Sequence, residues 1–385
     1  MKSVVELLSD LIRIPSPSAV SNRPLVEYAA GSLRSIGWST RELPYRDDAG
    51  LEKINLIAAP PGQDVAARAV DLVFMCHTDT VPFASDWDDA LKPIFDVGML
   101  HGCGSCDVKG FLACLLSAAA QSDAFLPGLR IVLSAEEEIG CIGAARLLDQ
   151  DVLRPRRMVI GEPTSLHPAR AGKGYCLAEV TVFGKEAHSA HPGQGVSAIF
   201  HAARLLRAIE DLSAALAQER NEFFDPAWTT INVGTIEGGT AKNIVPGLCR
   251  FQLEWRPIPG QAPDRILSEV AQMIAQLRRI DPGFRAEIRP LRQQPGFETP
   301  ENAALVRRLE SLTGRPAVSI PFGSEASIFA PVAEEIVVIG AGDMRTAHSS
   351  RECVPVAELE EAVRCVRALM SPASEPSNAA DAGTR

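Results

Sequence analysis

The chain has 385 residues, a length that suggests two or three domains rather than one. With 46% hydrophobic and 22% charged residues, its composition is that of a globular protein and excludes a fibrous or disordered chain. The formal net charge of −10 argues against a nucleic-acid partner, because phosphate binding requires clustered Lys and Arg.

The N-terminal segment has acidic residues within its apolar stretch and no small-residue cleavage site. We therefore expect an amphipathic helix over residues 2–13, not a signal peptide. A second helix is expected over 24–36. No run of about 18 apolar residues occurs, so we expect no membrane partner. Nine cysteines, an odd number without framework spacing, favour reduced thiols and a cytoplasmic location.

Short apolar runs then alternate with helical patterns as far as residue 161. The expected strands cover 54–60, 69–76, 129–135 and 157–161, and the expected helices follow Asp107 and cover 141–150. The segment 83–106 between them is expected to be a loop. Alternation of this kind predicts an α/β fold with a mainly parallel sheet and crossover helices.

Near residue 175 the pattern changes to half-exposed alternating strands with two amphipathic helices, which predicts a small antiparallel sheet with helices on one face. The buried run 334–342 returns to the parallel style, and a helix over 355–370 follows. We therefore expect a main domain in two parts, an inserted α+β domain, and a disordered tail. The expected ranges are 1–176 and 290–370 for the main domain, 177–289 for the insertion, and 371–385 for the tail.

Four of the expected parallel-type strands each end just before a His or a carboxylate. These residues are His77, the pair Glu137 and Glu138, Glu162, and His348. In an open parallel sheet the carboxyl ends of the strands converge on one crevice. We therefore expect these side chains to meet.

Carboxylates gathered in one crevice repel each other by about 4 kcal/mol per pair at ~4 Å and an effective dielectric near 20. Metal cations would relieve this repulsion, and imidazoles combined with carboxylates suit zinc or a related divalent ion. Asp107, on the glycine-rich loop before a helix, is a further candidate ligand. Three carboxylates and one hydroxide would neutralise two divalent cations, so charge favours two ions.

Asp79 lies two residues after His77, and residues i and i+2 of an extended segment point to the same side. We expect the Asp79 carboxylate to bind the second ring nitrogen of His77 and so to fix its tautomer and orientation.

Each of these residues taken alone has a simpler explanation. His77 and Asp79 could form a satisfied loop cluster, Glu136–Glu138 a solvated helix start, Glu162 a turn cap, and His348 a surface residue. Only their joint position after parallel-type strands favours a metal site. Cys103 and Cys106 form a CxxC pair, but without a second pair a zinc or redox site is disfavoured, and Cys106 is expected to pack inward. The other histidines are expected to be structural or exposed; they are His101, His167, His191 and His201.

The segments HTDTVP, GCGSCDVKG, EEEIG, GEPT, GKEAHSAHPGQGVSA, GGTAKNIVP, RPIPG and AHSSRE occur in this order. Together they resemble the co-catalytic zinc amidohydrolases, a family that includes acetylornithine deacetylase, succinyl-diaminopimelate desuccinylase, carboxypeptidase G and aminoacylase. The resemblance covers residues from about 5 to 370.

The resemblance implies a zinc-peptidase-like catalytic domain and an inserted lid or dimerisation domain. It implies that one metal is held by His77, Asp107 and Glu162, and the other by Asp107, Glu138 and His348, with Asp107 bridging. It further implies that Glu137 is the general base. His188 of the insertion matches the family residue that donates to the oxyanion, often across a dimer interface after lid closure, so we expect a homodimer.

Within the family, RPIPG with Arg256 and PFGSEAS with Ser324 and Glu325 look most like acetylornithine deacetylases. As hypotheses, Arg256 and Asn243 would bind the substrate α-carboxylate. Glu325 would attract a cationic side chain, or would only form a local hydrogen bond. Cys103 departs from the family pattern, in which many members have Arg.

The expected protein is thus an enzyme with two divalent metal ions, zinc or else cobalt, that deacetylates the small molecule N-acetylornithine in arginine biosynthesis. One alternative is a deacylase or dipeptidase for another N-acyl amino acid, such as acetylcitrulline or succinyl-diaminopimelate. Another is a non-catalytic family member, against which Glu137 and the complete set of ligands weigh.

Overall fold

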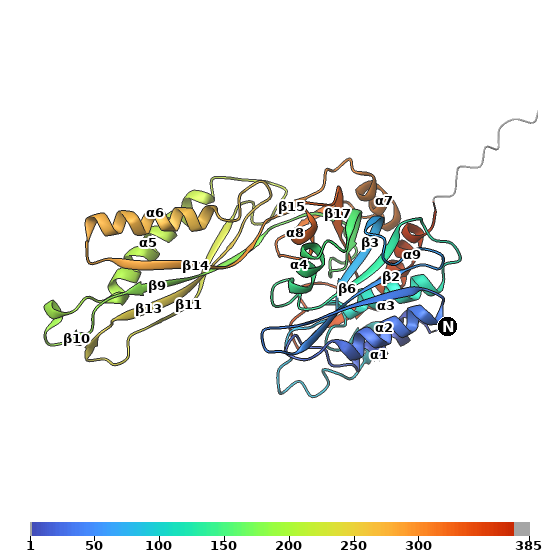
Figure 1. The fold of residues 1–385 in the computed structure, drawn as a ribbon, viewed down its shortest axis with the longest axis horizontal. Coiled ribbons are helices and arrows are strands. Elements are labelled where there is room, and N and C mark those ends of the chain that lie inside the picture. Colours follow the sequence, from blue (N-terminus) through green and yellow to red (C-terminus); the bar gives the residue numbers. More distant parts are fainter. Residues whose placement is uncertain (1, 373–385) are drawn as a thin grey trace, which may run out of the picture. The chain divides into compact units, whose positions relative to one another are not determined.

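A computed structural model describes residues 2–372 of the chain, which form two compact units (Figure 1). The first unit contains the residues up to Pro168, residues 302–316, and the residues from Val332 onward. The second unit contains Ala169–Glu301 and Ala317–Pro331. From residue 373 on, the predicted disordered tail lies outside the described residues.

The first unit is built on a sheet whose strand order is β1-β2-β6-β3-β7-β17. The strands are β1 (Ser39–Arg46), β2 (Glu52–Ala59), β3 (Ala69–His77), β6 (Leu129–Ser134), β7 (Arg154–Ile160) and β17 (Glu335–Val338). β3 pairs in parallel with β6 and β7, and β17 pairs in parallel with β7. The predicted mainly parallel sheet is therefore confirmed.

The edge of this sheet differs from the prediction, because β2 runs antiparallel to β6 and β1 runs antiparallel to β2. The sequence pattern does not predict β1. Its residues, STRELPYR, are mostly polar and half-buried or exposed, so they lack the apolar run that marks the inner strands.

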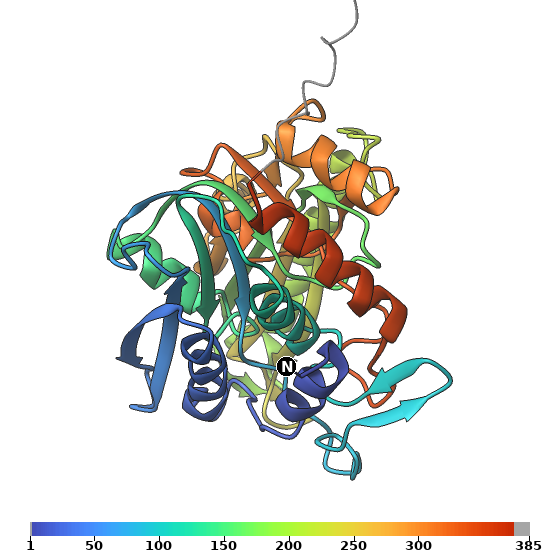
Figure 2. The same cartoon turned by 90° about the vertical axis from the view of Figure 1, so that its right-hand side faces the viewer.

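Helices pack around this sheet, and α3 is the one buried along nearly its whole length. It contacts α1, α2 and α9, which lie near it at the side of the unit that faces the viewer in Figure 2. The helices of the first unit are α1 (Val4–Ile12), α2 (Arg23–Ser35), α3 (Lys109–Ala120), α4 (Ile142–Asp149), α7 (Ala304–Thr313) and α9 (Val356–Met370). Across residues 2–372, none of the helices combines the length and the hydrophobicity that a membrane span requires.

A three-stranded sheet occupies part of the segment that was expected to be a loop. The hairpin of β4 (Ile94–Asp96) and β5 (Met99–His101) pairs through β5 with β18 (Cys353–Pro355) in antiparallel fashion. This pairing brings the chain just after His348 next to the chain just before Asp107.

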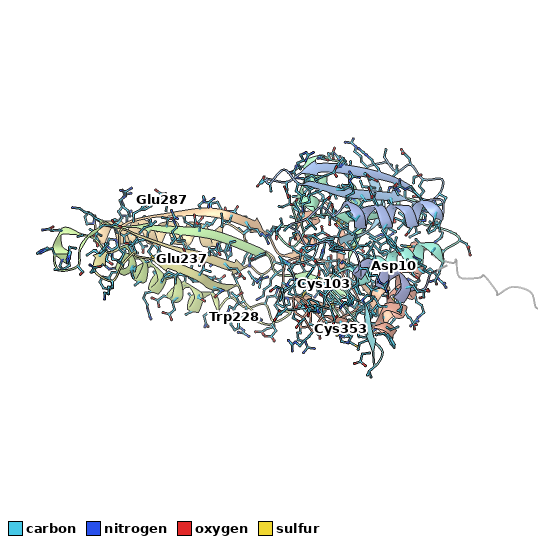
Figure 3. The ribbon with its side chains drawn as sticks, turned by 90° about the horizontal axis from the view of Figure 1, so that it is seen from below. Asp10, Cys103, Trp228, Glu237, Glu287 and Cys353 are labelled. Carbon is cyan, nitrogen blue, oxygen red and sulfur yellow. The ribbon has the colours of Figure 1, made fainter. Side chains whose placement is uncertain are left out.

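The second unit contains an antiparallel sheet of order β11-β13-β9-β14, with α5 (Ala198–Leu216) and α6 (Arg265–Ile280) packed against one face. Its strands are β9 (Tyr175–Phe183), β11 (Thr230–Gly238), β13 (Leu248–Arg256) and β14 (Arg285–Gln294). Alternate residues of β9, from Cys176 to Val182, form the core beneath the helices. Glu237 and Glu287 mark the two outer strands in Figure 3. This is the arrangement that the alternating pattern predicts.

Shorter elements complete the second unit. They are β8 (Ala169–Gly172), β10 (Ala187–His188), η1 (Pro192–Gln194), β12 (Ile244–Val245), β15 (Phe297–Glu298), β16 (Val318–Ile320) and α8 (Ala326–Phe329). β8 pairs with both β15 and β16, so the second unit extends beyond the expected insertion 177–289 on both sides and includes 317–331. Strand pairing between distant segments sets these borders, and composition does not reveal it.

Candidate metal centre

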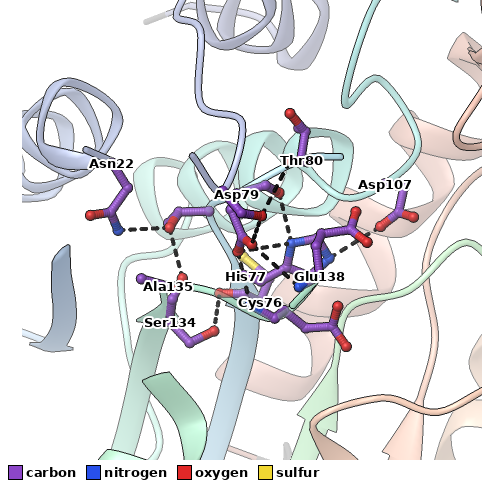
Figure 4. A network of polar contacts seen from close by, with 12 residues as sticks. Asn22, Cys76, His77, Asp79, Thr80, Asp107, Ser134, Ala135 and Glu138 are labelled. Carbon is purple, nitrogen blue, oxygen red and sulfur yellow. Dashed lines mark hydrogen bonds and ion pairs between the residues drawn. The ribbon is translucent and has the colours of Figure 1, made fainter. Parts of the chain in front are cut away.

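The carboxyl ends of the parallel strands in the first unit carry the predicted ligands, as Figure 4 shows for the residues around His77. His77 is the last residue of β3, Glu138 follows β6, and Glu162 follows β7. One donor atom from each of His77, Asp107 and Glu138 lies within 4.8 Å of the others. The structure thus brings together residues from three separate segments.

Asp107 lies between the two predicted histidine ligands. Its Oδ1 is 3.1 Å from Nε2 of His77, and its Oδ2 is 3.1 Å from Nε2 of His348. The same His348 nitrogen is also 3.1 Å from Oε1 of Glu138. Asp107 therefore directs one oxygen toward each imidazole, which is the arrangement that a bridging carboxylate requires.

The orientation of His77 is fixed differently from the prediction. Its Nδ1 lies 2.9 Å from the backbone carbonyl oxygen of Asp79, whereas the Asp79 carboxylate is 3.8 Å away. Since a carbonyl oxygen only accepts, Nδ1 carries the proton and donates it, and Nε2 is the ring nitrogen that faces Asp107. The prediction that the Asp79 carboxylate binds the His77 ring is therefore wrong. The tautomer is still the expected one, with Nε2 left to bind a metal.

The carboxylate of Asp79 binds the loop after β6. It accepts the backbone N–H groups of Glu137 at 3.0 Å and Glu138 at 3.3 Å, and the hydroxyl of Ser18 at 2.7 Å. Asp79 is only 3% exposed. Its side chain thus holds the backbone that carries both the predicted base and a predicted ligand.

The imidazoles lie in a strongly negative field. Burial opposes the charged form of His77, but the hydrogen bond to Asp107 and the charges of Glu137, Asp107 and Glu162 outweigh it and raise its pKa well above the usual value. Hydrogen bonds to Asp107 and Glu138 raise the pKa of His348 to about 10. Burial alone would raise the pKa of Asp107, yet its hydrogen bonds to His348 and His77 lower it.

The remaining carboxylates are destabilised in their charged form. Burial, followed by the charges of Asp107 and Glu137, raises the pKa of Glu162 well above its usual value. Burial also raises the pKa of Glu138, with a further contribution from Asp107 and an opposing hydrogen bond to His348. A divalent cation would relieve this repulsion, and imidazole nitrogens with carboxylate oxygens are suitable donors, so the residues present fit a metal ion.

Glu137, the predicted base, is half-buried beside this cluster. Its Oε1 accepts a hydrogen bond from the thiol of Cys141 at 3.4 Å. Neither Cys141 nor Ser18, whose hydroxyl donates to Asp79, is among the residues predicted for the site. No spacing rule points to them, because their contacts depend on how the loops meet.

In the second unit, the structure brings His188 and Asn243 together. His188 on β10 is paired with Ile244 on β12, and the N–H of Ser189 donates to the carbonyl of Asn243 at 2.9 Å. The Nδ1 atom of His188 accepts the N–H of Ala190 at 3.0 Å. A neutral His188 therefore carries its proton on Nε2, and its side chain is exposed.

Arg256 belongs to the four-stranded sheet, not to the two-stranded sheet of β10 and β12 that carries His188. It is the last residue of β13, whereas Asn243 precedes the first, Leu248. A nine-residue strand spans roughly 30 Å at ~3.3 Å per residue. Within one chain, Asn243 and Arg256 are thus too far apart to bind the same carboxylate. The Arg256 guanidinium instead donates to Glu254 at 2.9 Å and lies 4.5 Å from the centre of the Tyr175 ring.

Ser324 and Glu325 immediately precede α8, and both are buried. The Ser324 hydroxyl accepts the N–H of Ala326 at 3.3 Å, and the Glu325 carbonyl accepts the N–H of Ile328 at 3.0 Å. The hydroxyl of Ser324 thus satisfies a backbone donor at the start of this short helix. The Glu325 side chain is completely buried.

The cysteines and histidines that were not expected to take part in the site differ in their surroundings. Cys103 and Cys106 are both buried, and burial raises the pKa of each thiol. His201 is buried with its Nε2 3.3 Å from Asp281, while His191 is exposed.

The chain is similar to proteins of one family. The profile of peptidase family M20/M25/M40 matches residues 73–371. The acetylornithine deacetylase of Myxococcus xanthus is 44% identical over 363 residues, a match that covers 94% of each chain. A tripeptidase from Staphylococcus aureus subsp. aureus mu50 superposes with a TM-score of 0.74 at 24% identity, over 95% of this chain and 96% of that one. A dinuclear metal-binding peptidase of the M20 family from Bacillus subtilis superposes with a TM-score of 0.65 at 14% identity, over 95% and 96%.

At these identities the two solved structures show the shared fold. The family profile covers His77, Asp107, Glu138, Glu162 and His348, all of which lie within residues 73–371. The chain therefore belongs to peptidase family M20/M25/M40, and it is a metal-dependent amidohydrolase.

Proposed function

We propose that this amidohydrolase cleaves the amide bond of N-acetylornithine to give ornithine and acetate. The proposed pathway is arginine biosynthesis, and the proposed location is the cytoplasm. The observation that carries the proposal is the 44% identity to the acetylornithine deacetylase of Myxococcus xanthus over 94% of both chains. The segments around Arg256 and Glu325 support it, since they resemble that subfamily.

We further propose that His77, Asp107 and Glu162 hold one divalent cation and that Asp107, Glu138 and His348 hold a second, zinc being the first choice and cobalt the second. When bound, such cations supply a Lewis acid and hydroxide near neutral pH. The position of Asp107 supports a pair of cations, because its two oxygens face the two imidazoles at 3.1 Å each.

Glu137 is the proposed general base. Glu137 directly precedes the proposed ligand Glu138 in the sequence, and the Asp79 carboxylate accepts the backbone N–H groups of both residues. Glu137 would take the proton of the attacking water and transfer it to the leaving amine, as a base of this kind does in amide hydrolysis. Asp79 supports it by holding its loop.

His188 is the proposed donor to the oxyanion. Because its Nδ1 accepts the Ala190 N–H, its Nε2–H is the group that can stabilise the negative charge that develops on the substrate oxygen. Arg256 is proposed to bind the α-carboxylate, with Asn243 as a further donor. Ser324 and Glu325 are proposed to shape the pocket for the cationic side chain.

The separation of Arg256 from His188 and Asn243 supports a homodimer. If all three residues act on one substrate, one copy must supply Arg256 and the other copy His188 and Asn243, since Arg256 ends β13 whereas the other two lie beyond its start. The insertion would then serve as the dimerisation domain.

A substrate panel tests the proposal. Purified enzyme loaded with zinc or cobalt is assayed on N-acetylornithine, N-acetylcitrulline, succinyl-diaminopimelate, neutral N-acetyl amino acids and short peptides. N-acetylornithine is expected to give the highest kcat/KM. A higher value for another compound would reassign the substrate but leave the amidohydrolase class intact.

A further inference from the structure

Glu352 is a buried carboxylate that binds the backbone of a distant loop. It lies four residues after His348 and is 3% exposed. Its Oε2 accepts the N–H of Gly104 at 2.9 Å, and its Oε1 accepts those of Cys106 and Asp107 at 3.1 Å each. Three backbone donors that converge on one anion form a nest of the type that binds carboxylates and phosphates.

The loop before α3 needs such a partner. Residues 102–107 are buried or nearly so, and they form no strand in which their N–H groups could pair. Gly104 has a φ of +79°, a left-handed conformation in which glycine is favoured. Buried N–H groups without an acceptor are strongly unfavourable, and Glu352 satisfies three of them.

Glu352 also connects two segments that carry proposed ligands. The N–H of Gly102 donates to the Glu352 carbonyl at 3.3 Å, and β18, directly after Glu352, pairs with β5, directly before Gly102. Cys103 and Cys353, which belong to these two stretches, are labelled in Figure 3. The loop of Asp107 and the loop of His348 are thus joined by protein contacts alone, across 245 positions of sequence between Glu352 and Asp107.

We propose that Glu352 is a positioning residue that holds the 104–107 loop so that the two oxygens of Asp107 face His77 and His348 before a metal ion arrives. The proposal rests on the assignment of the metal ligands above. Glu352 touches no donor side chain of the cluster; it acts through the backbone of Asp107. Because Asp107 is shared between the two proposed ions, loss of Glu352 should weaken the binding of both.

The test compares Glu352→Gln with Glu335→Gln. Glu335 is a matched control, because its carboxylate also accepts two backbone N–H groups in the first unit, from Ala304 at 3.3 Å and Leu305 at 2.8 Å, and these belong to α7. The measurement is the zinc dissociation constant, by competition with a fluorescent chelator, on protein first stripped of metal and checked for folding by circular dichroism. Glu352→Gln is expected to bind zinc roughly 10–100-fold more weakly than the wild type, as for other residues that support ligands, and Glu335→Gln equally well.

A purely structural role for Glu352 would lower the thermal stability of the metal-free protein and leave the zinc affinity of the folded variant unchanged, and that result would overturn the proposal. If Glu352→Gln does not fold, Glu352→Asp is used instead, because it keeps the negative charge but is one methylene group shorter. Unchanged zinc affinity in that variant would also overturn the proposal. A wild type that binds no zinc would instead contradict the ligand assignment.

Amide hydrogen exchange on the wild type provides a measurement that needs no variant. In the metal-free enzyme the amides of Gly104, Cys106 and Asp107 are expected to be protected. If they exchange at the rate of an unstructured peptide until zinc is added, the metal orders the loop and Glu352 does not.

Discussion

The carboxylate of Asp79 accepts the backbone N–H of Glu137 at 3.0 Å, and thereby ties the end of β3 to the loop that follows β6. The same carboxylate accepts the N–H of Glu138 at 3.3 Å. A single buried side chain therefore sets the positions of a proposed base and a proposed ligand. The backbone carbonyl of Asp79, on the other hand, orients His77.

Replacing Asp79 by Asn should disturb the base and not only the histidine. The amide oxygen can accept one of the two N–H groups, but the NH₂ group then faces the other, which costs about 1–3 kcal/mol of unfolding free energy. We expect kcat to fall more than KM rises. The loss of stability is measured by urea unfolding of the metal-free protein. Ser18→Ala is the control, since it removes one hydrogen bond to Asp79 but leaves both backbone contacts. An Asp79→Asn enzyme with wild-type stability and turnover would contradict this account.

Replacing Glu137 by Gln should abolish the proton transfer and retain the metal site. General bases contribute about 10²–10⁴-fold to the rate, so kcat is expected to fall by that factor. The metal content, measured by elemental analysis, is expected to stay at the wild-type value. Glu136→Gln serves as the neighbouring control. Glu136 accepts the Tyr45 hydroxyl at 2.8 Å, and an amide oxygen can still accept it. Full activity of Glu137→Gln would remove the base from the mechanism.

Metal binding should release protons near neutral pH. In the metal-free protein the hydrogen bonds to Asp107 and Glu138 raise the pKa of His348 from 6.5 to about 10, and the pKa of His77 is raised as well. His348 is then protonated at pH 7, and the raised pKa of His77 also favours its protonated form, yet a metal ligand must be neutral. We expect metal affinity to rise with pH between 6.5 and 8.5, and calorimetry in buffers of different ionisation enthalpy to show proton release. Binding without proton release would contradict the raised pKa values.

The same shifts fix the sign of a stability change in the metal-free protein. A histidine whose pKa is higher in the folded than in the unfolded state stabilises the fold fully at pH values below about 6.5. For His348 this contribution is lost as the pH rises through about 10. The denaturant midpoint of metal-free enzyme should therefore fall over this range, and His348→Asn should flatten the dependence. A denaturant midpoint that rises with pH over this range would contradict the raised pKa of His348.

Two inactive variants should complement each other if the enzyme is a dimer that shares residues. His188→Ala and Arg256→Ala are each expected to lose most activity. In a mixed dimer one of the two sites receives the intact Arg256 and the intact His188, so a randomly mixed population should recover about a quarter of wild-type activity. Co-expression of the two chains, followed by kcat measurement, tests this. The double variant mixed with wild type is the control. If the residues act across subunits, each site of a mixed dimer has one altered residue and only wild-type dimers are active, which leaves about a quarter of the activity; if each chain supplies both residues, about half remains. Absence of recovery would indicate that each chain supplies both residues itself.

The sequence by itself determined the α/β class and the place of the candidate metal site. His77 ends one buried apolar strand, and Glu138 and Glu162 follow two others. Parallel strands present their carboxyl ends at one edge, so the convergence of these residues follows from strand order and direction alone. Asp107 was recognisable from its glycine-rich loop at a helix start. In these cases a local pattern and one general rule of sheet geometry suffice.

The tertiary structure decided what depends on contacts between distant segments. It paired β1 and β2 antiparallel at the sheet edge, assigned 317–331 to the second unit through β16, and placed Arg256 far from Asn243. It also gave Asp79 the backbone of Glu137 as its partner in place of the His77 ring, and Glu352 the backbone of Asp107. Backbone N–H groups are the same in every residue but proline, so a sequence does not mark which of them a buried carboxylate will meet; only the packing of the loops does.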